Sequence, residues 1–248
     1  MLIVDSLVKS FGGLLAIDDL SFQVKEGEIH AVIGPNGAGK TTLISQLSGE
    51  IKPDSGTVLF DGVNITGMDV HLRSSLGLAR SFQITNIFLD LTAHDNVSLA
   101  VQAHAGHSFK FWKDARKDHE LREPALEFLK QVGLDNRAEV VAAQLSHGEH
   151  RQLEIAMALA TCPKLLLLDE PMAGMGQKES LAMVEIIREL KGKLTILLIE
   201  HDMDVVFTLA DKITVLLNGR CIATDSPESI RKNPEVKKAY LGEENIDA

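Results

Sequence analysis

The segment at residues 34–41, GPNGAGKT, combines the residue types that bind the phosphates of a nucleotide. It has the pattern G-x-x-x-x-G-K-[ST], follows the apolar run Ile29–Ile33 and precedes Thr41–Ser48, which has helical character. Glycines let backbone N–H groups approach phosphate oxygens, and the helix start adds the positive end of its dipole. With these flanking elements, a chance glycine-rich turn is the weaker interpretation. The expected nucleotide-binding residues of this loop are Gly34, Pro35, Asn36, Gly37, Ala38, Gly39, Lys40, Thr41 and Thr42.

Within that loop, Lys40 is expected to reach the β- and γ-phosphates, and the Thr41 hydroxyl is expected to bind Mg²⁺. Two carboxylates follow a second apolar run, Leu165–Leu168. Asp169 would hold Mg²⁺ directly or through water, and Glu170 is placed to polarise a water molecule against the γ-phosphate. An acidic strand end is common by itself, but the phosphate loop in the same chain favours the catalytic interpretation.

A histidine follows a third apolar run, Thr195–Ile199, in the sequence Glu200-His201-Asp202. Open parallel sheets bind ligands outside the carboxyl ends of their strands. We therefore expect the three runs to bring Lys40, Glu170 and His201 to one edge of a sheet. A lone histidine is usually a satisfied polar group, but here a neutral His201 could donate a hydrogen bond to the γ-phosphate.

Ser146 and Glu149 have the spacing of a capping box at the start of a helix. A serine that accepts a backbone N–H still has its own O–H to donate, next to the positive end of the helix. Together with Gly148 this predicts a second anion site. The phosphate loop already supplies one cradle, so the second site would serve the nucleotide of a neighbouring subunit.

Continuous apolar runs separated by a helix at 181–190 indicate a mostly parallel sheet that is covered on both faces. Residues 1 to about 30 predict short strands with turns at Gly12-Gly13 and Glu26-Gly27, and residues 57–65 repeat this pattern. Residues 92–161 have helical periodicity. The sequence thus predicts an α/β core interrupted by a helical insertion.

Composition limits the function classes. The 248 residues carry a formal net charge of −10, which argues against nucleic acid as a partner. The two cysteines have no pairing or metal-ligand spacing, which favours a reducing compartment. No apolar run is long enough to cross a bilayer and the start does not resemble a signal peptide, so any membrane role is expected to come through a partner.

The chain resembles the ATP-binding subunits of ABC transporters over essentially its full length. The resemblance rests on five ordered motifs, which are Walker A at 34–41, the Q-loop at Phe82-Gln83, the signature LSHGE at 145–149, Walker B at 165–170 and the switch histidine His201. It implies a P-loop NTPase (RecA-like) core with a mostly parallel sheet and an N-terminal antiparallel β subdomain, formed by residues 1–91 and 162–248. Residues 92–161 would form an inserted helical subdomain.

The resemblance also implies cofactors and roles, with ATP and Mg²⁺ bound at this site. Gln83 would contact Mg²⁺ and relay the nucleotide state to a membrane subunit. Phe11 lies where the family places an aromatic ring against adenine, although it could equally fill the core. In a head-to-tail dimer with itself or a paralogous subunit, Ser146 and Gly148 of one chain would complete the site of the other.

Four segments, GGLLAIDDLSF, LSHGE, IEHDM and EVKKAYLG, are most similar to importers of branched-chain amino acids, whose relatives import urea, short amides or other hydrophobic amino acids. EVKKAYLG is also similar to a lipopolysaccharide-export ATPase, while IEHDM favours the importer. The implied partners are integral membrane permeases and, indirectly, a periplasmic solute-binding protein. The subunit would lie in the cytoplasm, peripheral to the inner membrane.

Two other classes are less favoured. ATP-gated switches that act on ribosomes normally fuse two such domains, and a GTPase would need an N-K-x-D motif, which does not occur.

Two departures from the family pattern stand out. His147 and Glu149 replace the common glycine and glutamine of the signature, and the D-loop at 172–176 lacks the usual aspartate or asparagine near Gly176. The stretch from His104 to His119 is interpreted as a surface loop and helix near the membrane subunit.

Overall fold

The computed structural model describes residues 1–81, 87–105 and 118–241 of the chain. They form two compact units. Unit 1 comprises Met1–Leu78, Leu165–Glu170 and Leu190–Ala248, and unit 2 comprises Ala79–Lys164 and Pro171–Glu189. No helix in the described part of the chain is long and apolar enough to span a membrane.

An antiparallel sheet in unit 1 has the strand order β2-β1-β4-β5. Its strands are β1 (Leu2–Phe11), β2 (Leu14–Val24), β4 (Ser55–Phe60) and β5 (Val63–Asn64). The turns predicted at 12–13 and 26–27 are confirmed. β1 and β2 have ten and eleven residues and are longer than the short strands predicted. Several register shifts let their pairing continue where the alternation of apolar and polar residues breaks down.

The second sheet contains the three apolar runs of the sequence. Its strands that lie wholly in unit 1 follow the order β10-β9-β3-β8-β7. They are β3 (Ile29–Ile33), β7 (Leu165–Asp169), β8 (Thr195–Ile199), β9 (Lys212–Leu217) and β10 (Arg220–Asp225). β3, β7, β8 and β9 pair in parallel, β10 is antiparallel to β9, and every residue of β3, β7 and β8 is buried. The predicted parallel sheet is confirmed.

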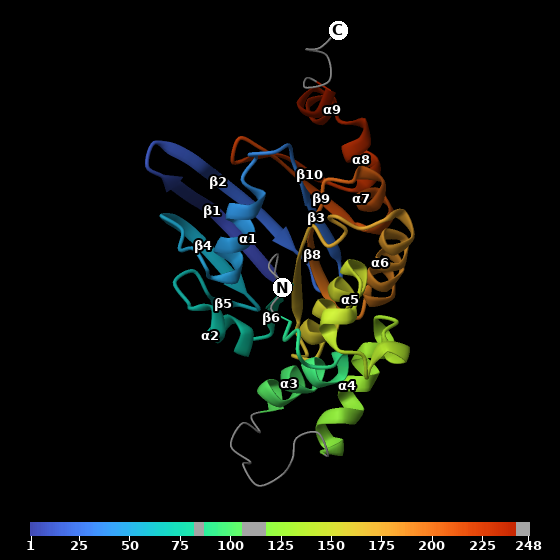
Figure 1. The fold of residues 1–248 in the computed structure, drawn as a ribbon. Helices are drawn as coiled ribbons and strands as arrows, with labels where there is room; N and C mark the ends of the chain where they lie inside the picture. Colours follow the sequence, from blue (N-terminus) through green and yellow to red (C-terminus); the bar gives the residue numbers. More distant parts are fainter. Residues whose placement is uncertain (82–86, 106–117, 242–248) are drawn as a thin grey trace. The chain divides into compact units, whose positions relative to one another are not determined.

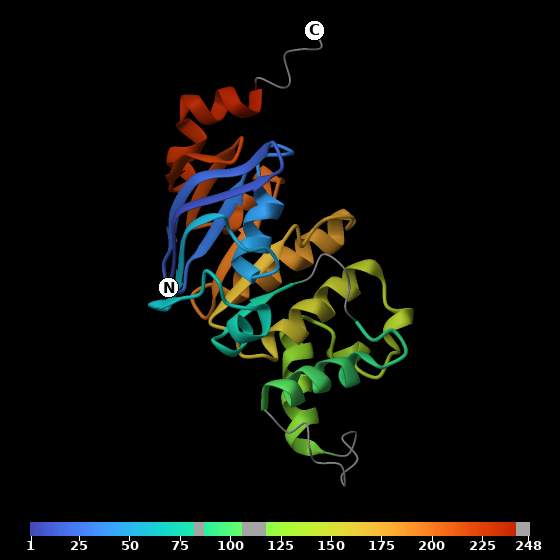
Figure 2. The same ribbon diagram turned by 90° about the vertical axis from the view of Figure 1, so that its left-hand side faces the viewer.

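Helices cover both faces of this sheet. On one face, α1 (Lys40–Ser48) lies between the two sheets, where Leu43 and Leu47 join a core with residues of both (Figures 1 and 2). The other face packs against the helices α7 (Met203–Leu209), α8 (Pro227–Lys232) and α9 (Pro234–Leu241). Adjacent β3 residues face opposite cores, with Val32 toward α1 and Ala31 toward α7.

The C-terminal end of α1 is held by a buried arginine from α2 (Val70–Ser75). Arg73 donates hydrogen bonds of 2.8 Å from Nη1 to the carbonyl oxygens of Gln46 and Leu47. Helices leave their last carbonyls without partners, and a cation at that end also complements the dipole. Burial lowers the pKa of the Arg73 guanidinium, and the nearby Asp69 acts in the opposite direction. These contacts fix the helix that begins at the phosphate loop.

Unit 2 is mainly helical, and α3, α4 and α5 pack against one another (Figure 1). Its elements are α3 (Ala93–Ala105), α4 (His119–Gln131), the 3₁₀ turns η2 (Asp135–Arg137) and η3 (Ala142–Gln144), α5 (His147–Leu159) and all but the last residue of α6 (Gln177–Leu190). The strand β6 (Leu78–Arg80) lies at the boundary between the units.

The unit boundaries differ from the expected ones in three places. Residues 79–91, 162–164 and 171–189 belong to unit 2, whereas the sequence placed them in the α/β core. The last difference has a physical cause in the contacts of segment 171–189 with the start of α5. His147 contacts the carbonyl oxygen of Ala173, and Ser146 donates a hydrogen bond to Glu179.

Candidate functional site

The phosphate loop runs directly from the end of β3 into α1, as predicted. Gly34 follows Ile33, and the helix begins at Lys40. Gly39 has a φ of 106°, in the left-handed region that favours glycine, and a Cβ placed on it would lie 2.5 Å from the carbonyl oxygen of Ala16. Position 39 therefore requires glycine for two reasons, which are the left-handed backbone and the close approach of another backbone segment. The motif glycine satisfies both conditions at once.

Two hairpins brace this loop from outside it, and sequence reasoning missed their contribution. The N–H of Gly219 donates to the carbonyl oxygen of Ala38 at 3.0 Å, and the N–H of Asp18 donates to the carbonyl oxygen of Gly219 at 2.9 Å. A side chain on Gly34 would clash with the carbonyl oxygen of Leu216. The hairpins β1–β2 and β9–β10 contain no phosphate-binding motif. Turn signals at Gly12-Gly13 and Asn218-Gly219 mark the hairpins themselves, but nothing in either sequence indicates contact with the loop.

The ammonium of Lys40 lies inside the loop. Its Nζ donates to the carbonyl oxygens of Gly34 at 2.6 Å and Pro35 at 3.1 Å, and the residue is only 8% exposed. Burial lowers the pKa of Lys40, while the carboxylates of Glu170 and Asp169 act in the opposite direction. The lysine and both Walker B carboxylates are therefore close enough to interact electrostatically, as the sequence predicted.

The start of α1 offers donors to an anion. In the described part of the chain no side chain caps this helix start, and its first turn carries no acidic residue. The first N–H groups of a helix have no partner within the helix and carry the positive end of the dipole. Thr41 is exposed here and Thr42 is partly buried. This region can bind a phosphate chain.

Glu170 adopts a backbone conformation that non-glycine residues rarely take. Its φ is 47°, and its N–H donates to the carbonyl oxygen of Ile199 at 2.9 Å. Such strain costs roughly 1–3 kcal/mol and persists where the surroundings fix it, often at functional positions. Asp169, the preceding residue, is 4% exposed at the end of β7, while 30% of the Glu170 side chain is exposed. The turn separates a buried carboxylate from an accessible one.

His201 lies beside Glu170, as the sheet argument predicted. Its Nδ1 is 3.7 Å from Glu170 Oε1 and 3.8 Å from Glu200 Oε2, and 63% of its side chain is exposed. The buried Glu200 accepts the N–H of His201 at 3.0 Å, and Asp202 caps α7. The backbone on both sides of His201 is therefore fixed while its ring remains accessible. Sequence reasoning assigned no role to Glu200, which holds the backbone at His201.

The oxygen donors of unit 1 fit a nucleotide-bound magnesium ion. No group of three or more histidine, cysteine or acidic residues that could hold a metal occurs in the described ranges. Mg²⁺ in nucleotide sites usually takes one or two protein oxygens, with phosphate and water supplying the rest. The elements α1 and β7 pack against each other. Thr41 near the start of α1 and Asp169 at the end of β7 offer a hydroxyl and a carboxylate that would suit such an ion.

Phe11 lies at the end of β1 and is 47% exposed, so it is not core filling. The Nζ of Lys9 lies 5.5 Å from the centre of the Phe11 ring and 2.7 Å from a carboxylate oxygen of Asp54. The hydrogen bond from Lys9, followed by one from the N–H of Ser10, lowers the pKa of Asp54. The ring is thus accompanied by a cation that an acidic residue holds in place.

The signature residues form the predicted capping box at the start of α5, in unit 2. The N–H of Ser146 donates to Glu149 Oε2 at 2.7 Å, and the N–H of Glu149 donates to Ser146 Oγ at 3.2 Å. Glu149 also forms an ion pair of 2.9 Å with Arg137. These contacts account for the glutamate at the position where glutamine is common. His147, the other departure, lies 3.2 Å through Nε2 from the carbonyl oxygen of Ala173.

The structure brings Lys40, Glu170 and His201 together in unit 1, and Ser146 lies with Gly148 in unit 2. The Ser146 O–H, expected to be a spare donor, points to Glu179 Oε1 at 3.3 Å. Gln83 lies outside the described residues, so its expected contact with Mg²⁺ stays a prediction.

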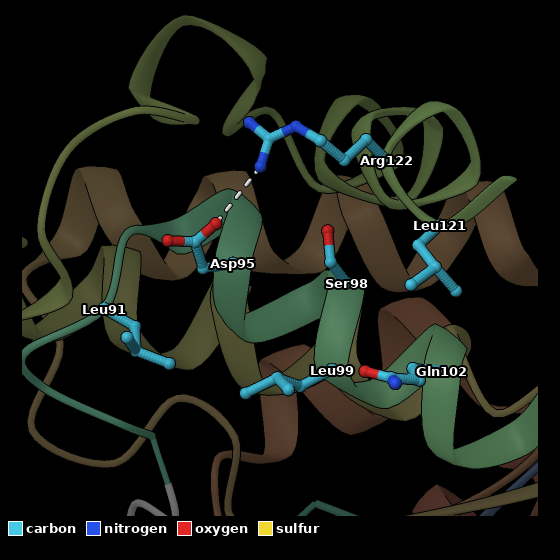
Figure 3. A pocket seen from close by; sticks show the side chains of 7 residues that line it. All are labelled: Leu91, Asp95, Ser98, Leu99, Gln102, Leu121 and Arg122. Atoms are coloured by element: carbon cyan, nitrogen blue, oxygen red, sulfur yellow. Dashed lines mark hydrogen bonds and ion pairs between the residues drawn. The ribbon is translucent and has the colours of Figure 1, made fainter. Parts of the chain in front are cut away.

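Unit 2 also has a mainly apolar pocket between α3 and α4 (Figure 3). It is lined by Leu91, Asp95, Ser98, Leu99, Gln102, Leu121 and Arg122. The ion pair between Asp95 and Arg122 measures 3.1 Å, and the buried hydroxyl of Ser98 has no hydrogen-bond partner in the described ranges. Its lining contains no set of groups suited to phosphate chemistry.

Comparisons with known proteins agree with this site. The ABC transporter family model matches residues 17–173, and that of the branched-chain amino acid ATP-binding cassette transporter matches residues 220–245. The chain is 39% identical to the high-affinity branched-chain amino acid transport ATP-binding proteins BraF of Pseudomonas aeruginosa and LivG of Escherichia coli. The BraF match covers 97% of both chains and the LivG match 98% of both.

Among solved structures, the chain is similar to the ADP conformation of MJ1267, an ATP-binding cassette of an ABC transporter. That match has a TM-score of 0.85 at 31% identity and covers 98% of both chains. The resemblance that the motifs indicated is confirmed over almost the whole length. The chain belongs to the ABC transporter family, as an ATP-binding subunit that hydrolyses ATP to drive transport.

Proposed function

We propose that this subunit hydrolyses Mg²⁺-bound ATP to energise the import of branched-chain amino acids. The observation that carries the hydrolytic part is the gathering of Lys40, Glu170 and His201 at the carboxyl end of one parallel sheet. The solute class is supported by the names of the BraF and LivG relatives and by the match at residues 220–245. Related amides and other hydrophobic amino acids are the competing solutes.

The site residues divide the reaction among them. The loop N–H groups and Lys40 would bind the β- and γ-phosphates, and Thr41, Asp169 and Gln83 would hold Mg²⁺, which neutralises phosphate charge. Glu170 would accept a proton from the attacking water while the oxygen of that water bonds to the γ-phosphorus. The bond from that phosphorus to the bridging oxygen of ADP then breaks. His201 would donate a hydrogen bond to the γ-phosphate.

A complete site would require a second subunit, identical or paralogous. Ser146 and Gly148 lie at the start of a 13-residue helix, where N–H groups and the dipole favour an anion. Ser146 is exposed, so the γ-phosphate bound by another chain could reach it. Hydrolysis would then report that two subunits have closed on ATP.

The expected membrane partners are permease subunits, which place this subunit at the cytoplasmic face of the inner membrane. A periplasmic solute-binding protein would deliver the solute to those permeases. The pocket between α3 and α4 supports a contact of this kind, because Leu99 is exposed there and Leu91 and Leu121 line it. An apolar side chain of the permease would fit such a lining.

Phe11 is proposed to stack on adenine. We expect Phe11→Ala to raise the Kd for ATP about tenfold, because loss of one base–aromatic stack costs about 1–3 kcal/mol. Fluorescence titration with a labelled ATP analogue measures the change. Leu14→Ala is the matched control, since Leu14 pairs with Phe11 across the same hairpin and is 68% exposed. Equal affinities for both variants would rule out the stacking role.

Transport in proteoliposomes tests the proposed solute. The subunit is purified with candidate permease subunits, reconstituted, and supplied with ATP and a candidate solute-binding protein. We expect uptake of labelled leucine, isoleucine and valine that stops when ATP is replaced by ADP. Uptake of urea or a short amide with no uptake of leucine would reject the amino-acid assignment and leave the ATPase assignment intact.

A further inference from the structure

The carboxylate of Glu179 lies over the start of the signature helix α5. Ser146 Oγ donates to its Oε1 at 3.3 Å. A Cβ placed on Gly148 would lie 2.7 Å from both the carboxyl carbon and Oε1. Glu179 therefore touches both residues that the proposed composite site assigns to a phosphate, and Gly148 is buried beneath it.

The contact has the chemistry of a bound anion. The first turn of a helix attracts negative charge, and a carboxylate there resembles a phosphate in charge and in its acceptor oxygens. The pocket at this place is small, about 190 Å³, and Glu179 lines it together with Ser146, Gly148 and Lys178. A γ-phosphate and the Glu179 carboxylate could not both occupy the position next to Ser146 and Gly148.

A purely structural role explains only half of this geometry. The N–H of Gly176 donates to Glu179 Oε2 at 3.1 Å, as a glutamate in the first turn often does for the residue before its helix. That interaction stabilises the start of α6 and uses Oε2 alone. It leaves unexplained why Oε1 lies against the start of a different helix, α5.

We propose that Glu179 is an internal competitor of the γ-phosphate at the signature site. In the separate subunit it occupies the anion position, and it moves aside when ATP bound by a second subunit delivers its γ-phosphate. ADP has no γ-phosphate to take its place. Glu179 thus raises the ATP concentration at which two subunits close. This inference rests on the composite site put forward under Proposed function.

The test compares variants in the Glu170→Gln background, in which the closed dimer is expected to accumulate. Size-exclusion chromatography with light scattering measures the dimer fraction against ATP concentration. Glu179→Gln keeps the contact with Gly176, because an amide oxygen accepts the same N–H, but it removes the charge. We expect the ATP concentration at half-maximal dimer to fall about tenfold, because charge-assisted hydrogen bonds are roughly twice as strong as neutral ones.

Two further variants separate charge from helix capping. Glu179→Ala removes both, so it should also lower the half-maximal ATP concentration if charge controls closure, and it is available if the glutamine variant does not fold. Glu189→Gln removes a charge from an exposed position of the same helix and should leave the curve unchanged.

The outcomes distinguish this inference from the function on which it rests. If Glu170→Gln alone forms an ATP-dependent dimer and neither Glu179 variant lowers the ATP requirement, Glu179 is a helix cap and the competitor role is rejected. If no variant forms a dimer at saturating ATP, the composite site itself is rejected, and the inference with it.

Discussion

Replacing Glu170 by glutamine is expected to lower ATP turnover by about 10²–10⁴-fold, the range that a positioned general base contributes. Glutamine keeps the volume and one acceptor oxygen but cannot take a proton from water. ATP binding should persist, because Lys40 and the loop N–H groups are unchanged. Phosphate release measures turnover, and equilibrium binding of labelled ATP measures affinity. The ATP-bound dimer should accumulate, because hydrolysis no longer dissolves it.

The control is Glu26→Gln, which removes an exposed carboxylate from a turn of the same unit. It should hydrolyse ATP at the rate of the unaltered protein. Near-normal turnover in the Glu170 variant would show that another group activates the water. His201 would then be the next candidate, since its Nδ1 is 3.7 Å from Glu170 Oε1.

The strands that position the chemistry could be predicted almost residue by residue. β3 and β8 have the bounds read from the sequence, and β7 is one residue longer. These strands are buried on both faces, so their sequences are unbroken apolar runs that end where polar or turn-forming residues begin. The parallel order then places Lys40, Glu170 and His201 together. Local sequence determined this part of the site because each group lies in the segment that directly follows its strand.

Contacts between distant segments could not be predicted in the same way. The glycine pattern indicates that something approaches the loop closely, but it does not say what. The structure identifies these neighbours. Ala16 precedes the loop in the sequence, and Leu216 and Gly219 lie far beyond its end. The left-handed backbone of Glu170 was equally invisible, because glutamate has no special preference for positive φ.

The helix α6 shows how one unrecognised contact changes a boundary. Periodicity predicted a helix from 181, whereas the helix begins at Gln177. Its first turn carries no apolar pattern, and the bond from the N–H of Gly176 to Glu179 stabilises it instead. The spacing of the two residues was available in the sequence as a capping signal. Without a serine or threonine at the first position, the signal was too weak to be noticed.

Replacing Ser146 by arginine is expected to reduce ATP hydrolysis by at least about 10²-fold, the loss seen when one preorganised oxyanion donor is removed. The long side chain would fill the position next to Gly148, and its guanidinium could pair with the Glu179 carboxylate already there. Each subunit should still bind ATP with its usual affinity, because Lys40 and the loop lie in unit 1. Phosphate release and ATP titration of the same sample measure the two effects.

Loss of a helix cap must be separated from loss of the anion site. Ser146 caps α5, and replacing a capping serine costs about 1 kcal/mol of stability. Ser226→Arg is the matched control, since Ser226 caps α8 by accepting the N–H of Ser229 and belongs to no proposed site. Both variants should lose similar stability in denaturant unfolding, but only the Ser146 variant should lose hydrolysis. Unchanged turnover in that variant would mean that each subunit hydrolyses ATP alone, and dimer closure would no longer explain how hydrolysis is coupled to transport.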